Sequence, residues 1–347
     1  MSTVRIGIVG MGWWACDVHI PNFLQVPDAQ IAALCSRNPD NIQRGRDALG
    51  DGPAPLTFSA YDELLASDAI DAIVICTPNA THGPMALAAL QAGKHVLVEK
   101  PLATVPAQCA PIVAEAAARG LTLQVGVELR YADVATTMRR LIDDGAIGEP
   151  AVLHTNVWRA WGAPGSWRSS VAESGGQFHE LAIHYIDLLG FLAGSPPQWT
   201  VAAGGSRVGF RDVDHAFATI GYAGGAIASF GMCLFAAGGG SDITMEVIGL
   251  EGRLVGEVMG GTVRLWPKGA TEPIDHSPAR TDAEVKGFPG SLESARAFVE
   301  CVRTGARPCA DAEQGAHLCR VCEAARLSAL AGGRRMDLDA LDADTAS

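Results

Sequence analysis

The sequence predicts an α/β protein: an N-terminal doubly wound parallel sheet, then a C-terminal α+β domain built on an open, mostly antiparallel sheet. Three observations predict this class. The 347 residues are enough for two domains, each with its own core. Short β-branched runs alternate with helical stretches over the first third of the chain. After about residue 126 the pattern changes to longer alternating strands joined by glycine-rich turns.

The first domain is predicted to span residues 1–125 and to hold its sheet between two helical layers. Its strands are expected at 4–9, 31–35, 56–58, 71–76, 95–98 and 121–125. Helices are expected at about 61–67, 83–92 and 106–119, and after the first strand, where Pro21 is expected to interrupt the helix. Because parallel sheets bind ligands at the carboxyl ends of their strands, we expect the chemistry just after these strands.

The second domain is predicted to span residues 126–335, followed by an acidic tail at 336–347 that is expected to fray. Gly224 and Gly225 divide an alternating run over 219–228 and predict a hairpin, since such a turn needs positive φ angles. Helices are expected near 134–143, 178–193, 291–303 and 311–331. The last of these closes the fold and is expected to pack back on the first domain.

The composition argues against several classes of protein. A net charge of −12 disfavours a nucleic-acid-binding protein, which needs a clustered Lys/Arg surface. The N-terminus does not read as a secretory signal, and no stretch is long and apolar enough to cross a membrane. Nine cysteines, an odd number, indicate reduced thiols in a cytoplasmic protein. The one CxxC pattern, Cys319 to Cys322, is interpreted as helix packing rather than a metal or redox site.

Gly10-Met11-Gly12-Trp13-Trp14-Ala15 follows the first strand and opens the first helix. Glycines in this place let the backbone approach a pyrophosphate, and the helix N-terminus offers unpaired N–H donors. We therefore predict that a dinucleotide binds at Gly10, Gly12, Trp13 and Trp14. The simpler alternative is an ordinary glycine turn.

The end of the second strand bears on the type of dinucleotide. An acidic side chain there would bond the ribose 2′-hydroxyl of NAD, but this strand ends in Cys35-Ser36-Arg37. A hydroxyl beside a guanidinium suits a 2′-phosphate, because arginine offers a planar fork of donors and a fixed charge. NADP is therefore favoured over NAD. The alternative is that Arg37 is only a solvated loop charge.

Glu99-Lys100-Pro101 directly follows another predicted strand, so Lys100 is expected at the ligand edge of the sheet. A lysine in this position can bond a substrate oxygen. We expect the peptide bond before Pro101 to be cis. A surface Glu-Lys pair after a strand is the alternative interpretation.

The second cluster is the helical segment 175–187. Glu180 and His184 are four residues apart and therefore share a helix face, with Asp187 nearly one turn further. Histidine can take and give a proton near neutral pH, and a neighbouring carboxylate orients it. We predict a catalytic His184 with Glu180 beside it; a structural histidine is the alternative. Three ligands on one helix without a distant fourth argue against a metal site.

In order and spacing, these motifs resemble those of the Gfo/Idh/MocA family, which includes glucose–fructose oxidoreductase and inositol dehydrogenase. The resemblance rests on the glycine turn, Thr77-Pro78-Asn79 with His82, Glu99-Lys100-Pro101, Trp167-Arg168 and the 175–187 segment. It covers nearly the whole chain, including the closing helix.

The resemblance implies a Rossmann domain followed by a substrate domain whose open sheet often forms the interface of a homodimer or homotetramer. It implies that Lys100 and His184 form the catalytic pair, with Glu180 in a place where the family usually carries the shorter aspartate. Cofactor contacts are implied for Thr77, Pro78, Asn79, His82, Glu99 and Lys100. Substrate contacts are expected from Lys100, Arg130, Trp161, Trp167, Arg168 and His184, and also from Tyr131 and His154, since sugars are held by polar forks and flat aromatic faces. For the arginines, the aromatic residues and His154, the alternative is plain packing.

The expected function is an NAD(P)-dependent oxidoreductase that moves a hydride between the nicotinamide and a secondary alcohol or carbonyl of a sugar, cyclitol or related polyol. His184 would take the hydroxyl proton while Lys100 holds the oxygen. Two alternatives stay open: an NAD-dependent glycosidase of the same fold, and a non-catalytic cofactor-binding regulator. The presence of both Lys100 and His184 favours an enzyme.

Overall fold

The computed structural model describes residues 3–161, 165–210, 212–238, 243–279 and 288–341 of the chain. The chain divides into two compact units. Unit 1 holds residues 1–104, 108–128 and 290–316, and unit 2 holds residues 105–107, 129–289 and 317–347. The chain therefore leaves unit 1 after its last strand and returns to it with a helix near the C-terminus.

Unit 1 is built on a six-stranded parallel sheet with the order β3-β2-β1-β4-β5-β6. Its strands are β1 (Val4–Val9), β2 (Ala29–Cys35), β3 (Leu56–Phe58), β4 (Ala72–Ile75), β5 (His95–Glu99) and β6 (Leu123–Gly126). The central strands are almost wholly buried apolar residues, as a sheet covered on both faces requires. The strand order reverses between β1 and β4, and ligands bind at such switch points. The predicted doubly wound sheet is confirmed.

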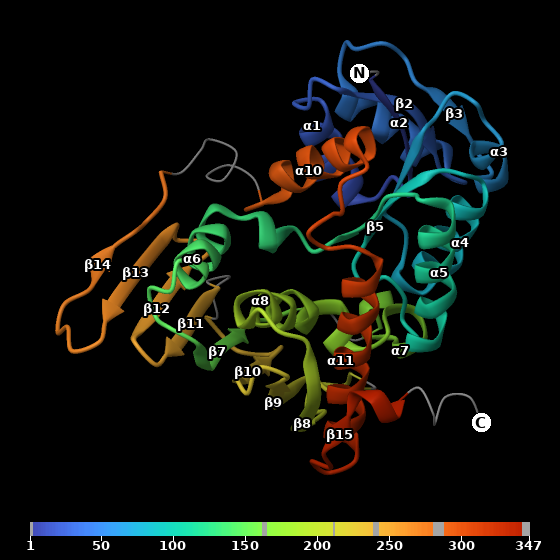
Figure 1. Cartoon of the computed structure of the whole chain (residues 1–347). Helices are drawn as coiled ribbons and strands as arrows, with labels where there is room; N and C mark the ends of the chain where they lie inside the picture. The colour runs from blue at the N-terminus through green and yellow to red at the C-terminus, as the bar shows by residue number, and fades with distance from the viewer. Residues whose placement is uncertain (1–2, 162–164, 211, 239–242, 280–287, 342–347) are drawn as a thin grey trace. The chain divides into compact units, whose positions relative to one another are not determined.

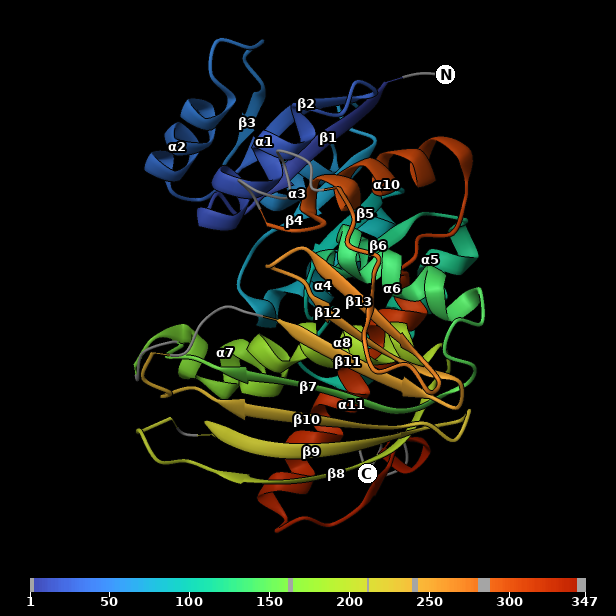
Figure 2. The same ribbon diagram turned by 90° about the vertical axis from the view of Figure 1, so that its left-hand side faces the viewer.

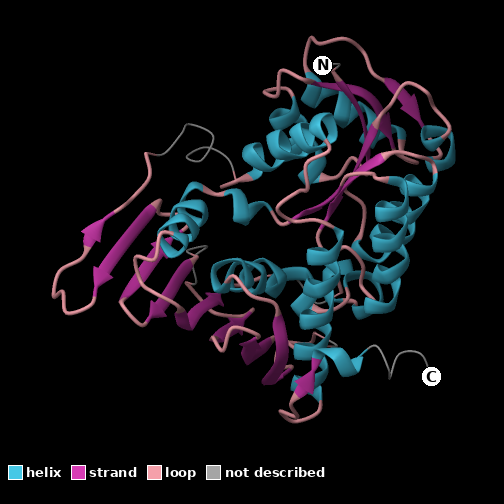
Figure 3. Cartoon of the chain, in the orientation of Figure 1, coloured by secondary structure: helices cyan, strands magenta, loops and turns pink. Residues whose placement is uncertain are grey.

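Helices lie on both sides of the unit 1 strands (Figures 1 and 3). They are α1 (Ile20–Phe23), α2 (Pro39–Leu49), α3 (Tyr61–Leu65), α4 (His82–Gln91), α5 (Cys109–Arg119) and α10 (Ser291–Thr304). α1 packs against α2 and α10, whereas α4 packs against α5. α10 also contacts β1, although it comes from the far end of the sequence.

Two helical details of unit 1 differ from the expectation. A π-helical turn over Ala15–His19 runs into α1 without a break at Pro21. Pro21 is the second residue of α1, which follows directly on the π turn, and Ile20 before it keeps right-handed helical dihedrals. α2 was not expected at all. Its sequence does carry the signals, because the Asn38 side chain caps the first turn, Pro39 opens it and Gly50 ends it with a φ of 65°.

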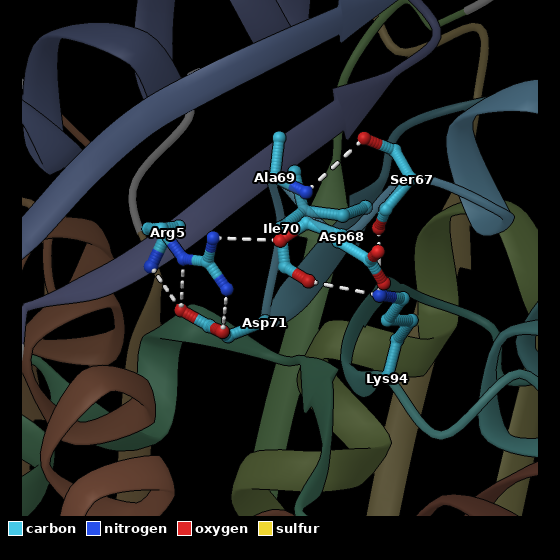
Figure 4. A network of polar contacts seen from close by, with 7 residues as sticks. All are labelled: Arg5, Ser67, Asp68, Ala69, Ile70, Asp71 and Lys94. Atoms are coloured by element: carbon cyan, nitrogen blue, oxygen red, sulfur yellow. Dashed lines mark hydrogen bonds and ion pairs between the residues drawn. The ribbon is translucent and has the colours of Figure 1, made fainter.

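A polar network holds the edge of the unit 1 sheet at which the strands begin (Figure 4). The Arg5 guanidinium on β1 donates to both carboxylate oxygens of Asp71, which precedes β4, at 3.0 and 2.6 Å. The Lys94 ammonium, just before β5, donates to the carbonyls of Ser67 and Ile70 at 2.9 Å. Three neighbouring strands are thereby tied together at the edge opposite to their carboxyl ends.

Unit 2 is built on a nine-stranded sheet with the order β14-β13-β12-β11-β7-β10-β9-β8-β15. Its strands are β7 (Pro150–Trp158), β8 (Pro197–Gly205), β9 (His215–Tyr222), β10 (Ile227–Cys233), β11 (Thr244–Gly249), β12 (Gly252–Glu257), β13 (Thr262–Pro267), β14 (Ile274–Asp275) and β15 (Met336–Asp337). All the pairings are antiparallel except that of β7 with β10. Figure 2 shows the long strands β7, β10, β9 and β8 side by side. The predicted open, mostly antiparallel sheet is confirmed.

The two faces of the unit 2 sheet differ in what covers them. α6 (Asp133–Asp143) contacts β12 and β13, and α8 (Ile183–Ala193) contacts β7 and β10. In Figure 3 both helices lie on the same side of the strands. On the other face, polar residues such as His154 and Ser229 alternate with buried ones, and three apolar side chains are open to solvent: Phe217 is 65% exposed, Val152 48% and Ile227 45%.

Several smaller expectations can be compared with unit 2. The hairpin forms between β9 and β10, but only Gly225 has a positive φ, of 85°. The tail was expected to fray from Asp337, yet β15 and a short helix over Leu338–Ala340 are formed, and residues 342–347 lie outside the described part. Within the described residues, no helix has the length and apolarity needed to cross a membrane.

Candidate functional site

The glycine turn after β1 has the geometry that a dinucleotide requires. Gly10 has a φ of 88°, and a Cβ placed on it would lie 2.4 Å from the carbonyl oxygen of Cys76. Only glycine fits between these two strand ends. A Cβ on Gly12 would meet nothing within 4 Å, so the backbone there faces open space. The turn thus offers bare main chain at the topological switch point, which is what a pyrophosphate needs for close approach.

The two tryptophans of this turn have different surroundings. Trp13 is 50% exposed, so its ring is available to a ligand. Trp14 is half-buried, and its indole Nε1 donates to Oε1 of Glu99 at 2.7 Å. Trp14 therefore contacts the protein's own interior through its indole N–H, whereas Trp13 is the more exposed of the two.

Ser36 and Arg37 follow β2 as predicted. The Ser36 main-chain N–H donates to the carbonyl of Phe58, and its hydroxyl oxygen accepts from the main-chain N–H of Asn38 at 3.2 Å. Arg37 is exposed, and among the described residues no carboxylate forms an ion pair with it. A fixed positive charge therefore stands open to solvent at the end of β2.

His82 joins the loop after β4 to the loop after β5. Its Nε2 lies 2.7 Å from the carbonyl oxygen of Thr77 and its Nδ1 lies 2.8 Å from that of Pro101. Burial lowers the pKa of His82, and the two carbonyls oppose this only in part, so the ring is neutral near pH 7 and donates to one carbonyl at a time. His82 and its neighbour Asn79 are buried, at 1% and 3% exposed, so they shape the loops from within.

Glu99 and Lys100 stand at the carboxyl end of β5, and the peptide bond from Lys100 to Pro101 is cis, as expected. Glu99 is 8% exposed, and its Oε1 accepts from Trp14 and also lies 2.8 Å from Nε2 of His19. Burial raises the pKa of Glu99, but the hydrogen bond from His19 and the positive charge of Lys100 outweigh it, so the pKa lies below its usual range. Glu99 is thus a charged group held by protein donors, while Lys100 is half-buried beside it.

In unit 2, the segment that carries Glu180 and His184 is not one regular helix. Phe178–Ala182 forms a π-helical turn, and α8 begins at Ile183. The expected continuous α-helix over 178–193 is therefore corrected: its first turn is wider. Such turns occur often at functional sites. Glu180 is buried in the π turn, and His184 is half-buried in the first turn of α8.

Glu180 is held by an arginine from the loop before it. Arg168 Nε donates to Glu180 Oε1 at 2.9 Å, and Gln177 donates to the main-chain carbonyl of Arg168 at 2.6 Å. The Arg168 side chain is 41% exposed, whereas that of Glu180 is 3% exposed. The buried carboxylate is therefore held by the Arg168 guanidinium, which lies between it and solvent.

Two tryptophan rings surround this pair. The Arg168 guanidinium lies 4.7 Å from the ring centre of Trp167 and 5.6 Å from that of Trp161. A second guanidinium, that of Arg159, lies 4.5 Å from the Trp161 ring. The structure thus brings together Trp161, Trp167, Arg168 and Glu180, all predicted site residues, and adds Arg159, which the sequence analysis missed.

Arg130 and Asp187 form a buried ion pair. Arg130 Nη2 lies 2.6 Å from Asp187 Oδ1, and the two side chains are 7% and 1% exposed. Burial raises the pKa of Asp187, and Arg130 opposes this rise. Arg130 was predicted to contact substrate, but its guanidinium is directed to a protein carboxylate inside unit 2, which assigns it to holding α8.

Two further histidines have other surroundings. His154 was considered for substrate contact, but its side chain lies on the sheet face opposite to α8, where Nδ1 is 2.7 Å from the Ser229 hydroxyl. This expectation is wrong, because successive strand residues point to opposite faces. His179 is wholly buried, and burial lowers its pKa. Its ring is therefore neutral and packs in the interior of the protein.

The sequence analysis also missed His19. Its ring is 8% exposed and bonds Glu99, a residue 80 positions further along the chain. No local pattern could have paired them, since the contact depends on the β1 and β5 ends meeting at one edge of the sheet. The signal available was only a histidine one turn beyond a glycine motif.

The two parts of the chain also match two parts of known proteins. The family model described as "Oxidoreductase family, NAD-binding Rossmann fold" (GFO_IDH_MocA) matches residues 4–127, and the GFO/IDH/MocA C-terminal domain model matches residues 135–255. The scyllo-inositol 2-dehydrogenase (NAD(+)) of Bacillus subtilis is 31% identical over 319 residues, which cover 88% of this chain and 88% of that protein. The D-xylose 1-dehydrogenase [NADP(+)] of Haloarcula marismortui is 25% identical over 327 residues, which cover 90% and 88%. The crystal structure of an oxidoreductase domain protein from Kribbella flavida superposes with a TM-score of 0.88 at 23% identity, covering 97% of this chain and all of that one.

Proposed function

Because the chain belongs to the Gfo/Idh/MocA family of NAD(P)-dependent oxidoreductases, we propose that it transfers a hydride between a nicotinamide and a secondary alcohol or carbonyl of a sugar, cyclitol or related polyol. The observation that carries the proposal is the pairing of an open glycine turn after β1 with a lysine at the carboxyl end of β5. The first provides a place for a dinucleotide and the second a cation for a substrate oxygen. The two relatives, named for an inositol and for xylose, support this substrate class.

The proposed chemistry divides between the cofactor and four side chains. A bound nicotinamide supplies or accepts the hydride. In the oxidative direction, Lys100 holds the substrate oxygen and stabilises its developing negative charge. His184 takes the proton from the same hydroxyl, as an imidazole can do near neutral pH. Glu180, fixed by Arg168, supplies the negative charge that favours a protonated His184.

The substrate is proposed to rest against the aromatic and guanidinium groups of unit 2. Trp161 and Trp167 offer flat apolar rings, and Arg168 offers donors on its exposed side. Sugars are bound by this combination, because their C–H faces pack on rings while their hydroxyls need hydrogen-bond partners.

For the cofactor, we propose NADP as the preferred form and NAD as the alternative. An exposed Arg37 lies just after β2, and the strand end at Cys35 is followed by Ser36 rather than by the carboxylate that would bond the ribose 2′-hydroxyl of NAD. A 2′-phosphate would give Arg37 the anionic partner that it lacks among the described residues. The relatives include an enzyme named for each dinucleotide, so the choice rests on Ser36 and Arg37.

We also propose that the protein is a cytoplasmic homodimer or homotetramer that associates through the unit 2 sheet. The support is the exposed apolar side chains on the outer face: Val152 and Ile227 are paired on β7 and β10, and Phe217 on β9 lies against Trp158. Within the described residues no disulfide joins any of the nine cysteines, as a reducing compartment would leave them.

Nicotinamide absorbance measured with a panel of aldoses, cyclitols and polyols tests the function. Net conversion of NADP or NAD by at least one of them is the expected result. Cleavage of a chromogenic glycoside without net conversion would instead identify a glycosidase of the same fold. Binding of dinucleotide with no reaction on either panel would identify a regulator.

A further inference from the structure

One carboxylate in unit 1 bonds residues from two chain segments. Oε1 of Glu99 accepts from the indole of Trp14 at 2.7 Å and lies 2.8 Å from Nε2 of His19. Oε2 of Glu99 accepts from the main-chain N–H of Lys100 at 3.3 Å. Because a carboxylate can only accept, Nε2 of His19 must carry the proton. Both oxygens of Glu99 therefore have protein donors.

The surroundings of Glu99 favour its charged form. Besides His19 and Lys100, the titratable groups near it are His82 and Cys76, and burial keeps both of these neutral. Burial also raises the pKa of Glu99, but its partners outweigh this and lower the pKa overall. A buried charge is retained only where its partners are complete, so the network is costly to break.

The Glu99 carboxylate packs closely against the neighbouring strand. A Cβ on Gly126, in the neighbouring strand β6, would lie 2.7 Å from Glu99 Oε1. The His19 ring stacks on Phe23 at 6.0 Å and meets the edge of Trp14 at 6.3 Å. The side chains that hold Glu99 are thus themselves fixed by neighbouring rings.

We propose that Trp14, His19 and Glu99 are positioning residues that fix Lys100 relative to the glycine turn; this rests on the proposed role of Lys100. Trp14 and His19 belong to the turn and helix that follow Gly10, and Glu99 directly precedes Lys100. The turn keeps its own main-chain bonds, such as Gly10 N–H to the Cys35 carbonyl at 3.1 Å. Loss of the network therefore disturbs Lys100 more than it disturbs dinucleotide binding, and a small misplacement of such a group is costly to the reaction.

Substitution of His19 separates positioning from plain stability. His19→Ala is expected to lower kcat by about 10- to 100-fold, while the Kd for the dinucleotide, measured by calorimetry, changes by less than about threefold. His19→Gln keeps an N–H donor at similar reach and is expected to restore most of kcat. The matched control is Asp71→Asn, which breaks a polar network at the opposite edge of the same sheet. It is expected to lower Tm and leave kcat near that of the wild type.

A readout that needs no turnover accompanies the kinetics. In nitrogen-15 spectra of the protein without ligands, the lysine Nζ resonance that disappears in Lys100→Arg belongs to Lys100. It is expected to move in His19→Ala, return in His19→Gln and stay in place in Asp71→Asn. An unmoved resonance, or equal kcat losses in His19→Ala and His19→Gln, overturns the positioning role. If the wild type converts no substrate, the proposed function fails while this spectrum still decides the network.

Discussion

At the scale of single residues, Lys100 is the group on which the proposed chemistry depends most. Replacing Lys100 with Ala is expected to lower kcat by about 10²- to 10⁴-fold, the range for a lost proton-transfer or charge-stabilising group. The Kd for the dinucleotide should stay near that of the wild type, because the glycine turn is unchanged. Steady-state kinetics measures kcat, and calorimetry measures the Kd. Lys268→Ala, at an exposed surface pair with Glu251, is the control, and wild-type turnover in Lys100→Ala would remove the residue from the mechanism.

Arg37 bears on the choice between dinucleotides. Hydrogen bonds to charged groups contribute about 1.5–3 kcal/mol, so Arg37→Ala is expected to raise the KM for NADP by about tenfold or more. The KM for NAD should hardly change, since NAD has no 2′-phosphate. Arg46→Ala, on the exposed side of α2, is the matched control. Equal effects on both dinucleotides would show that Arg37 does not contact the 2′-position.

Residues whose partners are local could be predicted, and residues whose partners are distant could not. Gly10, Gly12 and Lys100 follow strand ends, where the parallel sheet itself dictates a ligand edge. His19 acquires its partner Glu99, 80 positions further along the chain, only after the strands have assembled. Arg130 failed as an expected substrate contact for the same reason, because Asp187 lies 57 positions away in sequence.

At the scale of elements, the Arg130–Asp187 pair holds α8 to the segment that enters unit 2. Removing one partner of a buried pair costs about 3–5 kcal/mol, because the other charge stays buried. Arg130→Met is therefore expected to lower the free energy of unfolding by about that amount in urea titrations. The double variant Arg130→Met with Asp187→Leu should recover much of the loss. A double variant as unstable as the single one would show that the charge is not the cause.

The Arg5–Asp71 ion pair at the start of β1 makes a contribution to the stability of unit 1 that depends on pH. The hydrogen bond from Arg5 lowers the pKa of Asp71, against the effect of its partial burial. The group then stabilises the fold above its unfolded pKa of 3.8, and the contribution is lost as the pH falls through the lower folded value. The difference in free energy of unfolding between wild type and Asp71→Asn should therefore shrink below about pH 4. A difference that is constant with pH would contradict this.

The sequence pattern predicted which strands form better than it predicted the detailed geometry of the helices. The βα alternation located every strand of the unit 1 sheet, since buried apolar runs of this length have few other solutions. The π turns at Ala15–His19 and Phe178–Ala182 left no such trace, because one extra residue per turn barely alters apolar spacing. α2 was overlooked although Asn38-Pro39 and Gly50 mark both its ends.

At the scale of the whole molecule, the outer face of the unit 2 sheet exposes apolar side chains, and we expect a second copy of the chain to cover them. Phe217→Asp replaces the most exposed of these apolar side chains with a charge and is expected to shift the oligomer towards a smaller species in chromatography with light scattering. Leu24→Asp, at a residue 53% exposed on unit 1, is the matched control and should leave the mass unchanged. An unaltered mass in Phe217→Asp would place the interface elsewhere.

The return of α10 to unit 1 has a consequence for how the protein is made. A ribosome finishes β1 to β6 and then must synthesise more than a hundred and fifty further residues before α10 exists, since it begins at Ser291. Until then α1 and the flank of β1 lack the helix that packs on them. The nascent dinucleotide unit is therefore completed only near the end of synthesis, although its sequence is translated first.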